Sequence, residues 1–341
     1  QPVESPARPK LTADKVPHLP DRDAWNFDLI RKAYPVGSPG RYSAVAFASR
    51  GCPFSCTFCK PLTGKEIRSR EIDSIVREIK YLKEHWNVQY VRFFDEVFIG
   101  SKFRIKSLCE AMIEEKLNIF WWCQTQVRLI DEDILKIMKK AGCIEIAYGV
   151  ESGSDTMLND MKKGISVDII RDVLEATDRS GIRISLNLLA GTPAETVETL
   201  KETRDFLISL NHINWANVPT IEFVVPLPGT ELFNTAVEMN LIENPKTYVV
   251  EALAKMEKYS KSINMTTMSS EVFISTVQKF NKELSKDFYK KHPIRFLMSV
   301  FSLDHLRWDL LFRNFSLRQV IPLLDSLAWA TVGKQMYRLK K

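Results

Sequence analysis

The sequence of 341 residues has little cysteine and no long hydrophobic run. No apolar stretch reaches the roughly 18 residues that cross a membrane, and no signal peptide is visible at the N-terminus. The six cysteines do not have the spacing of a disulfide framework, so we expect a protein of the reducing cytoplasm. Because the chain begins with Gln rather than Met, we expect a fragment or a processed form.

The net charge of +6 gives little guidance about partners. It fits an anionic substrate or surface, but it is too small to indicate nucleic-acid binding by itself. Hydrophobic residues make up 45% of the chain, which is enough for the core of one large domain or of two.

Three of the cysteines lie close together, in the segment 50–59 with the sequence RGCPFSCTFC. Cys52, Cys56 and Cys59 follow an apolar run, 42–49, that predicts a strand, so we place them on the loop after its carboxyl end. In barrels of parallel strands these loops carry the chemistry. Three thiolates can hold three irons of a 4Fe–4S cube while the fourth iron has no protein ligand. The alternatives are a zinc site or a cluster of buried cysteines, but zinc usually needs four ligands and no second Cys-x2-Cys or His-x3-His pair exists.

The C-x3-C-x2-C spacing, with Phe58 directly before the third cysteine, resembles the signature of the radical S-adenosylmethionine (SAM) enzymes. The resemblance implies that Cys52, Cys56 and Cys59 hold a 4Fe–4S cluster, that SAM chelates its fourth iron, and that Phe58 lies against the cofactor. It also implies that an electron from the reduced cluster splits SAM into methionine and a 5'-deoxyadenosyl radical, which removes hydrogen from an unactivated carbon. The implied electron donor is a protein such as ferredoxin or flavodoxin.

From residue 42 onward, strand-like and helix-like segments alternate, which predicts parallel strands joined by crossover helices. Six such units match the open (β/α)6 partial TIM-type barrel of this family. We therefore expect an α/β barrel over 42–235, an extended N-terminal linker over 1–41, and a C-terminal helical subdomain over 236–341. The predicted strands lie near 42–49, 88–95, 119–125, 145–150, 183–189 and 220–225, and the predicted helices near 71–85, 101–115, 131–141, 167–180 and 194–210.

Two loops after the predicted strands carry acidic segments that are similar to SAM-binding segments of the family. Asp95 and Glu96 follow the second strand, where relatives accept a hydrogen bond from the methionyl ammonium of SAM. Acidic residues that favour a helix N-terminus are the alternative. Glu151 and Ser152, in the sequence GVESG, resemble residues that face the ribose and methionyl part of SAM, although Ser and Gly are also ordinary in a capped turn.

The last two strands carry two further candidates. Asn187 on the fifth strand, and Pro226 in a Pro-x-Pro-Gly-Thr turn after the sixth, correspond to the adenosine side of the family's site. A plain turn ahead of a helix accounts for Pro226 equally well. The third strand departs from the family, because many relatives carry an arginine where Gln126 stands, and the sequence leaves open whether Arg128 takes its place.

The linker points to one branch of the superfamily. Its segment 19–25, LPDRDAW, resembles the stretch that precedes the radical SAM domain in cobalamin-dependent members, where a cobalamin-binding domain comes before the linker. About 40 residues are too few for such a domain, so cobalamin would need a domain absent from this chain. Members of this branch include carbon methyltransferases and ring-forming enzymes. The resemblance implies such an outcome on a small or lipid-like substrate.

The C-terminal segment is basic and amphipathic. Residues 286–341 contain eleven Lys or Arg against four Asp, a net +7, interleaved with large apolar residues. Such a segment can lie on an anionic membrane surface, close over an acidic or lipid-like substrate, or form a helical cap with a solvated polar face. Peripheral membrane contact is therefore an alternative to a purely cytoplasmic location.

Two other classes of function stay open. A non-catalytic metal or nucleic-acid module would use the cysteines only to staple the fold, but it would have no need of the SAM-like loops. A radical SAM enzyme that modifies RNA or a protein is the second. No recognisable RNA-binding module follows the barrel, and the basic tail is too apolar to resemble one, so we do not expect a nucleic-acid partner.

Overall fold

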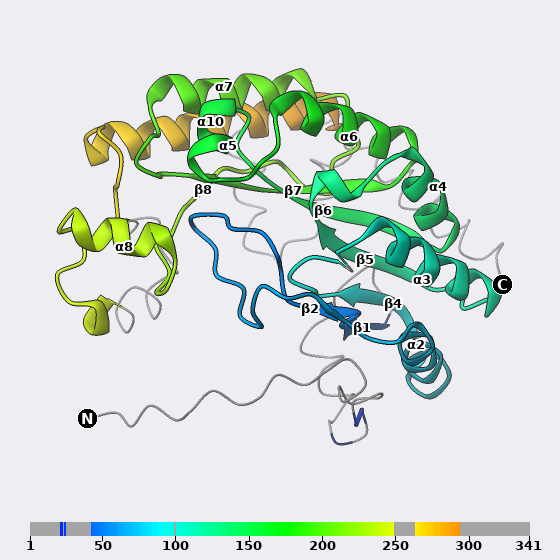
Figure 1. The fold of residues 1–341 in the computed structure, drawn as a ribbon. Coiled ribbons are helices and arrows are strands. Elements are labelled where there is room, and N and C mark those ends of the chain that lie inside the picture. Colours follow the sequence, from blue (N-terminus) through cyan, green and yellow to red (C-terminus); the bar gives the residue numbers. More distant parts are fainter. Residues whose placement is uncertain (1–20, 23, 25–41, 99, 249–262, 294–341) are drawn as a thin grey trace, which may run out of the picture.

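The computed structural model describes residues 21–22, 24, 42–98, 100–248 and 263–293. In this part of the chain, parallel strands form a curved six-stranded sheet in the order β1-β4-β5-β6-β7-β8. Helices lie along the convex side of the sheet, and the loop between β2 and β3 lies on the other side (Figure 1). The sheet is an open half of a TIM-type barrel, which confirms the predicted fold class.

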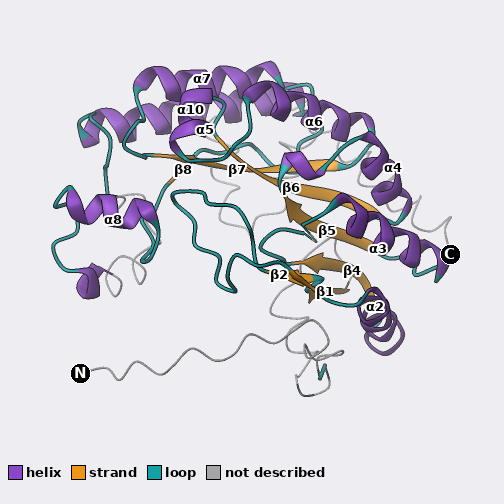
Figure 2. Cartoon of the chain, viewed as in Figure 1, coloured by secondary structure: helices purple, strands orange, loops and turns teal. Residues whose placement is uncertain are grey.

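The predicted barrel segments all have counterparts, and several short elements are additional (Figure 2). The short antiparallel pair β2 and β3 and the helix α5 were not expected from the sequence pattern, whereas α8 is the helix expected after the Pro-x-Pro-Gly-Thr turn. The strands are β1 (Tyr42–Ala46), β2 (Ser49–Arg50), β3 (Arg68–Ser69), β4 (Val88–Phe93), β5 (Phe120–Thr125), β6 (Cys143–Glu151), β7 (Arg183–Ala190) and β8 (Glu222–Phe223). The helices are α2 (Ile72–Trp86), α3 (Lys102–Glu114), the 3-10 helix η2 (Val127–Leu129), α4 (Glu132–Lys140), α5 (Asp155–Asp160), α6 (Val167–Arg179), α7 (Val197–Ser209), α8 (Glu231–Glu238) and α10 (Ser270–Lys291).

The two faces of the sheet differ because successive side chains of a strand point to opposite sides. On the outer face, Phe93, Trp121 and Tyr148 are fully buried beneath the helices. The alternate positions, such as Arg92 and Gln124, are polar and only partly buried. The outer positions therefore form the core, and the inner positions are free to line a site.

Helix α10 extends the barrel core beyond the boundary predicted at residue 235. It packs against α7, and its buried face, which includes Phe273, Val277 and Phe280, belongs to the same hydrophobic core as the sheet (Figure 1). The Asn281 side chain accepts a hydrogen bond from the amide of Ile221 and donates one to its carbonyl, both at 2.9 Å. These contacts fix α10 to the segment that enters β8.

Most of the predicted linker and basic tail lies outside the described residues. Only residues 21, 22 and 24 of the linker, and 286–293 of the tail, are described. Within the described part of the chain, no helix combines the length and the hydropathy needed to cross a membrane. The proposed membrane contact of the tail and the three-domain division therefore stay predictions.

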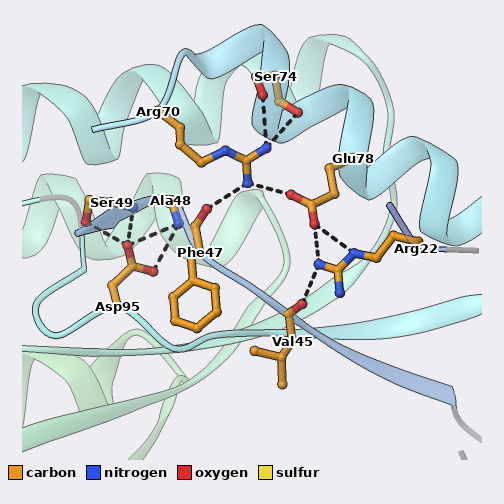
Figure 3. A network of polar contacts seen from close by, with 9 residues as sticks. All are labelled: Arg22, Val45, Phe47, Ala48, Ser49, Arg70, Ser74, Glu78 and Asp95. Atoms are coloured by element: carbon orange, nitrogen blue, oxygen red, sulfur yellow. Dashed lines mark hydrogen bonds and ion pairs between the residues drawn. The ribbon is translucent and has the colours of Figure 1, made fainter. Parts of the chain in front are cut away.

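Glu78 on α2 is a buried carboxylate held between two arginines (Figure 3). Arg70, directly after β3, and Arg22, from the linker, each form an ion pair with it. Arg70 also donates to the Phe47 carbonyl at 2.9 Å, and Arg22 donates to the Val45 carbonyl at 2.7 Å. The two arginines thus join α2 to the edge strand β1 and to the chain that leads into the loop with the three cysteines.

We expect Glu78→Gln to lower the free energy of unfolding by about 3 kcal/mol, because it leaves two poorly exposed guanidinium groups without their counter-ion. Glu84→Gln, an exposed position on the same helix, should change it by less than about 0.5 kcal/mol. Chemical denaturation of the three proteins measures both values. Equal losses of unfolding free energy in the two variants would show that the buried network stabilises the fold no more than an exposed glutamate does.

Glu195, directly before α7, is a second buried carboxylate, with 1% of its surface exposed. Its partners are the Thr199 hydroxyl and, at 3.4 Å, the amide of Gly191. Burial raises its pKa from an ordinary value of 4.5 to about 7, because these two hydrogen bonds offset only part of the lost solvation. The folded protein therefore holds a proton here that the unfolded chain releases. This contribution to stability is fully present below the unfolded pKa and is lost as the pH rises through about 7.

Glu195→Gln cannot ionise, so it should remove this dependence on pH. At each pH, the quantity of interest is the unfolding free energy of Glu195→Gln minus that of the unmodified chain. We expect this difference to be about 2 kcal/mol larger at about pH 8 than at about pH 5. Denaturation at the two pH values tests this, with Glu202→Gln on the exposed side of α7 as the control. A gain that is the same at both pH values would mean that Glu195 is ionised throughout.

Candidate active site

The three cysteines lie on residues 51–67, which we call the cluster loop. The loop leaves the fold through β2 and returns through β3, which pair with each other. Its middle is fixed from both sides at Thr57. The Thr57 amide donates to the carbonyl of Met161 next to α5 at 3.2 Å, and the Thr57 carbonyl accepts from the amide of Leu232 in α8 at 2.9 Å. The residue after α5 and the first turn of α8 thus anchor the loop between Cys56 and Cys59.

The base of the cluster loop requires a glycine. Gly51 has φ +95°, and a Cβ atom there would lie 2.0 Å from the carbonyl oxygen of Glu66. Only glycine can therefore occupy this position without moving the returning chain. The next amide, that of Cys52, donates to the Gly64 carbonyl at 3.1 Å and closes the loop.

Asp95 and Glu96, which follow β4, both bind main chain around the cluster loop. Asp95 is 1% exposed and accepts hydrogen bonds from the amide and, at 2.6 Å, the hydroxyl of Ser49 (Figure 3). Burial raises the pKa of Asp95 to about 6. Glu96 accepts from the Thr63 hydroxyl at 2.5 Å and from the amides of Thr63 at 3.1 Å and Gly51 at 2.8 Å, and these bonds outweigh its burial and lower its pKa. The two carboxylates therefore shape the loop.

All three cysteines line one cavity of about 540 Å³. Its volume falls within the range of small-molecule sites, about 300–1,000 Å³. The other predicted site residues divide into two groups. Phe58, Glu96, Glu151 and Asn187 line the cavity, whereas Asp95, Ser152 and Pro226 do not, and the Ser152 hydroxyl is hydrogen-bonded to that of Thr203 at 2.8 Å.

The cysteines are free thiols with unusually weak acidity. Burial raises the pKa of Cys52 and Cys56, and it raises the pKa of Cys59 to about 11 with a contribution from the other two sulfurs. Metals bind the thiolate form, so ligation at this site would release these protons. Within the described residues, no three or more acidic, His or Cys side chains surround a single ion position. A 4Fe–4S cube instead takes each thiolate on a different iron.

Glu151 and Lys163 form a buried ion pair that faces the cysteines. Their charged atoms are 3.1 Å apart, and the side chains are 7% and 3% exposed. Glu151 has φ +70° and lies at a shift in the β6–β7 register, which turns its side chain into the cavity. Gly149 leaves room for the pair, since a Cβ atom there would lie 2.8 Å from Glu151 Oε1. Burial raises the pKa of Glu151, although Lys163 opposes the shift.

The end of β5 presents polar atoms without partners to the same cavity. Gln126 Oε1 and Thr125 Oγ1 are buried and have no hydrogen-bond partner among the described residues, and both residues line the cavity. Arg128 does not take the place of Gln126. Its guanidinium stacks on the Phe54 ring at 4.6 Å and also bonds the Lys163 carbonyl. A bound polar molecule would satisfy the orphan atoms of β5.

Residues 47–207 match the sequence model of the radical SAM superfamily. This segment is a radical SAM domain. The family uses a 4Fe–4S cluster and SAM as cofactors, and the site fits both. Three sulfurs line one side of a cavity of suitable volume, and a buried ion pair and unpartnered amide and hydroxyl oxygens line other parts of it.

Several characterised or named radical SAM proteins are similar to this chain. An uncharacterized methyltransferase of Pyrococcus horikoshii is 27% identical, over 84% of this chain and 61% of the relative. The anaerobic magnesium-protoporphyrin IX monomethyl ester cyclase of Rubrivivax gelatinosus is 28% identical, over 68% of this chain and 40% of the relative. The hopanoid C-3 methylase of Methylococcus capsulatus is 28% identical, over 67% of this chain and 42% of the relative. The chain thus spans 40% to 61% of the length of these relatives.

Solved structures of the superfamily share the fold of this radical SAM domain. The methyltransferase TsrM of Kitasatospora setae, with tryptophan and a SAM analogue bound, has a TM-score of 0.51 at 20% identity and covers 59% of this chain and 39% of its own. The cobalamin-dependent enzyme OxsB, with aqua-cobalamin and SAM bound, has a TM-score of 0.50 at 16% identity. The match covers 88% of this chain and 50% of the OxsB chain. At this identity the likeness shows that the fold is shared.

Sequence reasoning missed Lys163, the cation of this radical SAM site. It follows Lys162, and the local sequence does not distinguish the two lysines. Lys162 is more than half exposed and pairs with Glu231, whereas the turn after α5 directs Lys163 inward to Glu151. An acidic residue placed in the cavity was the available signal, because a buried carboxylate needs a counter-ion.

Proposed function

We propose that this chain is the catalytic barrel of an enzyme that cleaves SAM reductively and removes a hydrogen atom from an unactivated carbon of a small or lipid-like molecule. The observation that carries the proposal is that Cys52, Cys56 and Cys59 line the same cavity as the Glu151–Lys163 pair. Thiolates suit iron, and an ion pair suits the zwitterionic methionyl end of SAM.

When bound, the cluster and SAM supply a one-electron cleavage that yields methionine and a 5'-deoxyadenosyl radical, which takes a hydrogen atom from the substrate. The residues of the chain position the parts. Lys163 would pair with the methionyl carboxylate, and Glu96 would accept from the ammonium. Glu151 and Asn187 would face the ribose and adenosine, and Phe58, which lines the cavity, would help to exclude water from the reacting carbon.

The relatives favour methyl transfer or ring formation as the outcome. Their names include a methyltransferase, a methylase and a cyclase, and the last two act on hopanoid and protoporphyrin molecules. We propose the same pair of outcomes for this chain, with an electron donor such as ferredoxin or flavodoxin. Any cobalamin would be held by a domain outside these residues.

The test is release of 5'-deoxyadenosine after anaerobic reconstitution with iron and sulfide, followed by reduction and addition of SAM. We expect methionine and 5'-deoxyadenosine in equal amounts, dependent on the reductant. A chain with an intact cluster that binds SAM but never forms the nucleoside, even with SAM and reductant in excess, would contradict the proposal. SAM with a deuterated methyl group separates methyl transfer from ring formation, because only the former places the label in the product.

A further inference from the structure

A second cavity, of about 340 Å³, lies on the inner face of the sheet next to the first. The two cavities share lining residues, among them Gln124, Asn187 and Asn217, so they adjoin. The charged residues of the second cavity are Arg92 and Glu145. It is therefore the part of the inner face that a substrate can occupy beside SAM.

The strand register places four side chains in one row across the inner face. Arg92 of β4 is level with Trp122 of β5, Trp122 with Glu145 of β6, and Glu145 with Arg183 of β7. Neighbouring strands are about 4.8 Å apart. Arg92 and Glu145 therefore lie two strand spacings apart, with Trp122 between them. Glu145 instead pairs with the adjacent Arg183, at 3.1 Å. Glu145, the one carboxylate among the described residues that line the second cavity, is thus already neutralised by Arg183.

Arg92 is held by aromatic rings and has no counter-ion among the described residues. Its guanidinium carbon lies 4.6 Å from the Trp122 ring centroid and 5.0 Å from that of Phe94. Nε is buried without a hydrogen-bond partner, and no ion pair or hydrogen bond of the guanidinium is formed within the described residues. Stacking fixes the plane of the guanidinium but satisfies none of its five N–H donors.

We propose that Arg92 binds an oxyanion group, a carboxylate or a phosphate, of the substrate, with the body of the substrate against Trp122, which lines the same cavity. A planar guanidinium that lies over aromatic rings keeps its N–H edge for an anion, and that edge matches two oxygens. Among the described residues that line the second cavity, the charge of Arg92 is uncompensated, because Glu145 is paired with Arg183. This inference rests on the proposed function, since it names the substrate class for the same site.

The experiment measures binding of matched probes to the cluster-loaded chain with SAM, by ligand-observed fluorine NMR. The probes are 4-fluorobenzoate, 4-fluorophenyl phosphate and the neutral 4-fluorobenzamide. We expect at least one anion to bind about tenfold or more tightly than the amide, as a charge-assisted pair requires. Whichever anion is preferred identifies the group. Equal affinity of all three probes would overturn the proposal.

Variants assign the preference to Arg92. Arg92→Gln should reduce it to about twofold or less, Arg92→Lys should retain part of it, and Glu145→Gln should increase it, because Arg183 then adds its charge. Arg171→Gln is the control, since Arg171 stacks on Phe206 at 5.1 Å but belongs to α6 outside the barrel. Circular dichroism checks that each variant is folded. A preference that survives in folded Arg92→Gln would refute the assignment.

The two proposals can fail separately. Probe binding needs no reduction of the cluster and no turnover, whereas 5'-deoxyadenosine release needs no substrate anion. If the preference depends on Arg92 but the chain never cleaves SAM, the anion site stands and the proposed reaction is refuted. Release of 5'-deoxyadenosine together with no such preference would leave the reaction and refute the anion site.

Discussion

Replacing Cys52, Cys56 or Cys59 with alanine is expected to remove the bound iron and abolish SAM cleavage. If each thiolate holds a different iron, as we propose, two remaining ligands cannot retain the cube. Iron should fall from about four atoms per chain to below about one, and 5'-deoxyadenosine should fall below detection. The thiol pKa values are raised, so reconstitution of the unmodified chain should also be more complete at higher pH, where thiolates form more readily.

Cys109→Ala is the matched control for the three cysteine variants. Cys109 is a fully buried thiol on α3 and is part of the hydrophobic core, outside the lining of the cavity. Its loss should lower stability by about 1 kcal/mol and leave iron content and SAM cleavage unchanged. Full iron content in any variant of the cluster loop, or loss of iron in Cys109→Ala, would contradict the assignment of the ligands.

Lys163→Met is expected to damage both stability and SAM binding. It leaves the buried carboxylate of Glu151 without its counter-ion, which should lower the free energy of unfolding by about 3–5 kcal/mol. It also removes the cation proposed for the methionyl carboxylate, so the Kd for SAM should rise about tenfold or more. Denaturation of the cluster-free chain and equilibrium dialysis of the cluster-loaded chain measure the two effects.

Two further variants separate these effects. Lys162→Met removes an exposed ion pair, with side chains 55% and 56% exposed, and should cost less than about 1 kcal/mol with no change in SAM affinity. The double variant Glu151→Gln, Lys163→Met should regain much of the lost stability, because no charge is left buried. It should not regain SAM affinity. If the double variant bound SAM normally, Lys163 would have a structural role alone.

The sequence predicts the barrel well because its strands and helices have strong and different patterns. Buried outer positions such as Trp121 and Tyr148 mark the strands, and the helices between successive strands predict that the strands are parallel. The cysteines could be placed for the same reason, since they follow the end of β1 by only a few residues. A short element such as α5 has too few residues to show a period.

The site itself could be predicted only in part. The sequence identifies Asp95 and Glu96 as acidic residues after a strand. It does not show that Asp95 binds Ser49 while Glu96 lines the cavity. The partner of Lys163 lies 12 residues away, beyond α5, and the neighbours of Arg92 lie on other strands. A bulge directs Glu151 toward Lys163, and strand register isolates Arg92 from Glu145. Such pairings depend on tertiary contacts that no local pattern records.

The most direct test of the central claim is electron–nuclear double resonance of the reduced cluster with SAM that carries isotopic labels in its methionyl amino and carboxylate groups. Three protein thiolates leave one iron for SAM, so we expect hyperfine coupling of the cluster to both labelled groups. The coupling should be absent in Cys56→Ala, which lacks the cluster. A reduced cluster in the unmodified chain with no coupling to either group, while SAM is bound, would contradict the account.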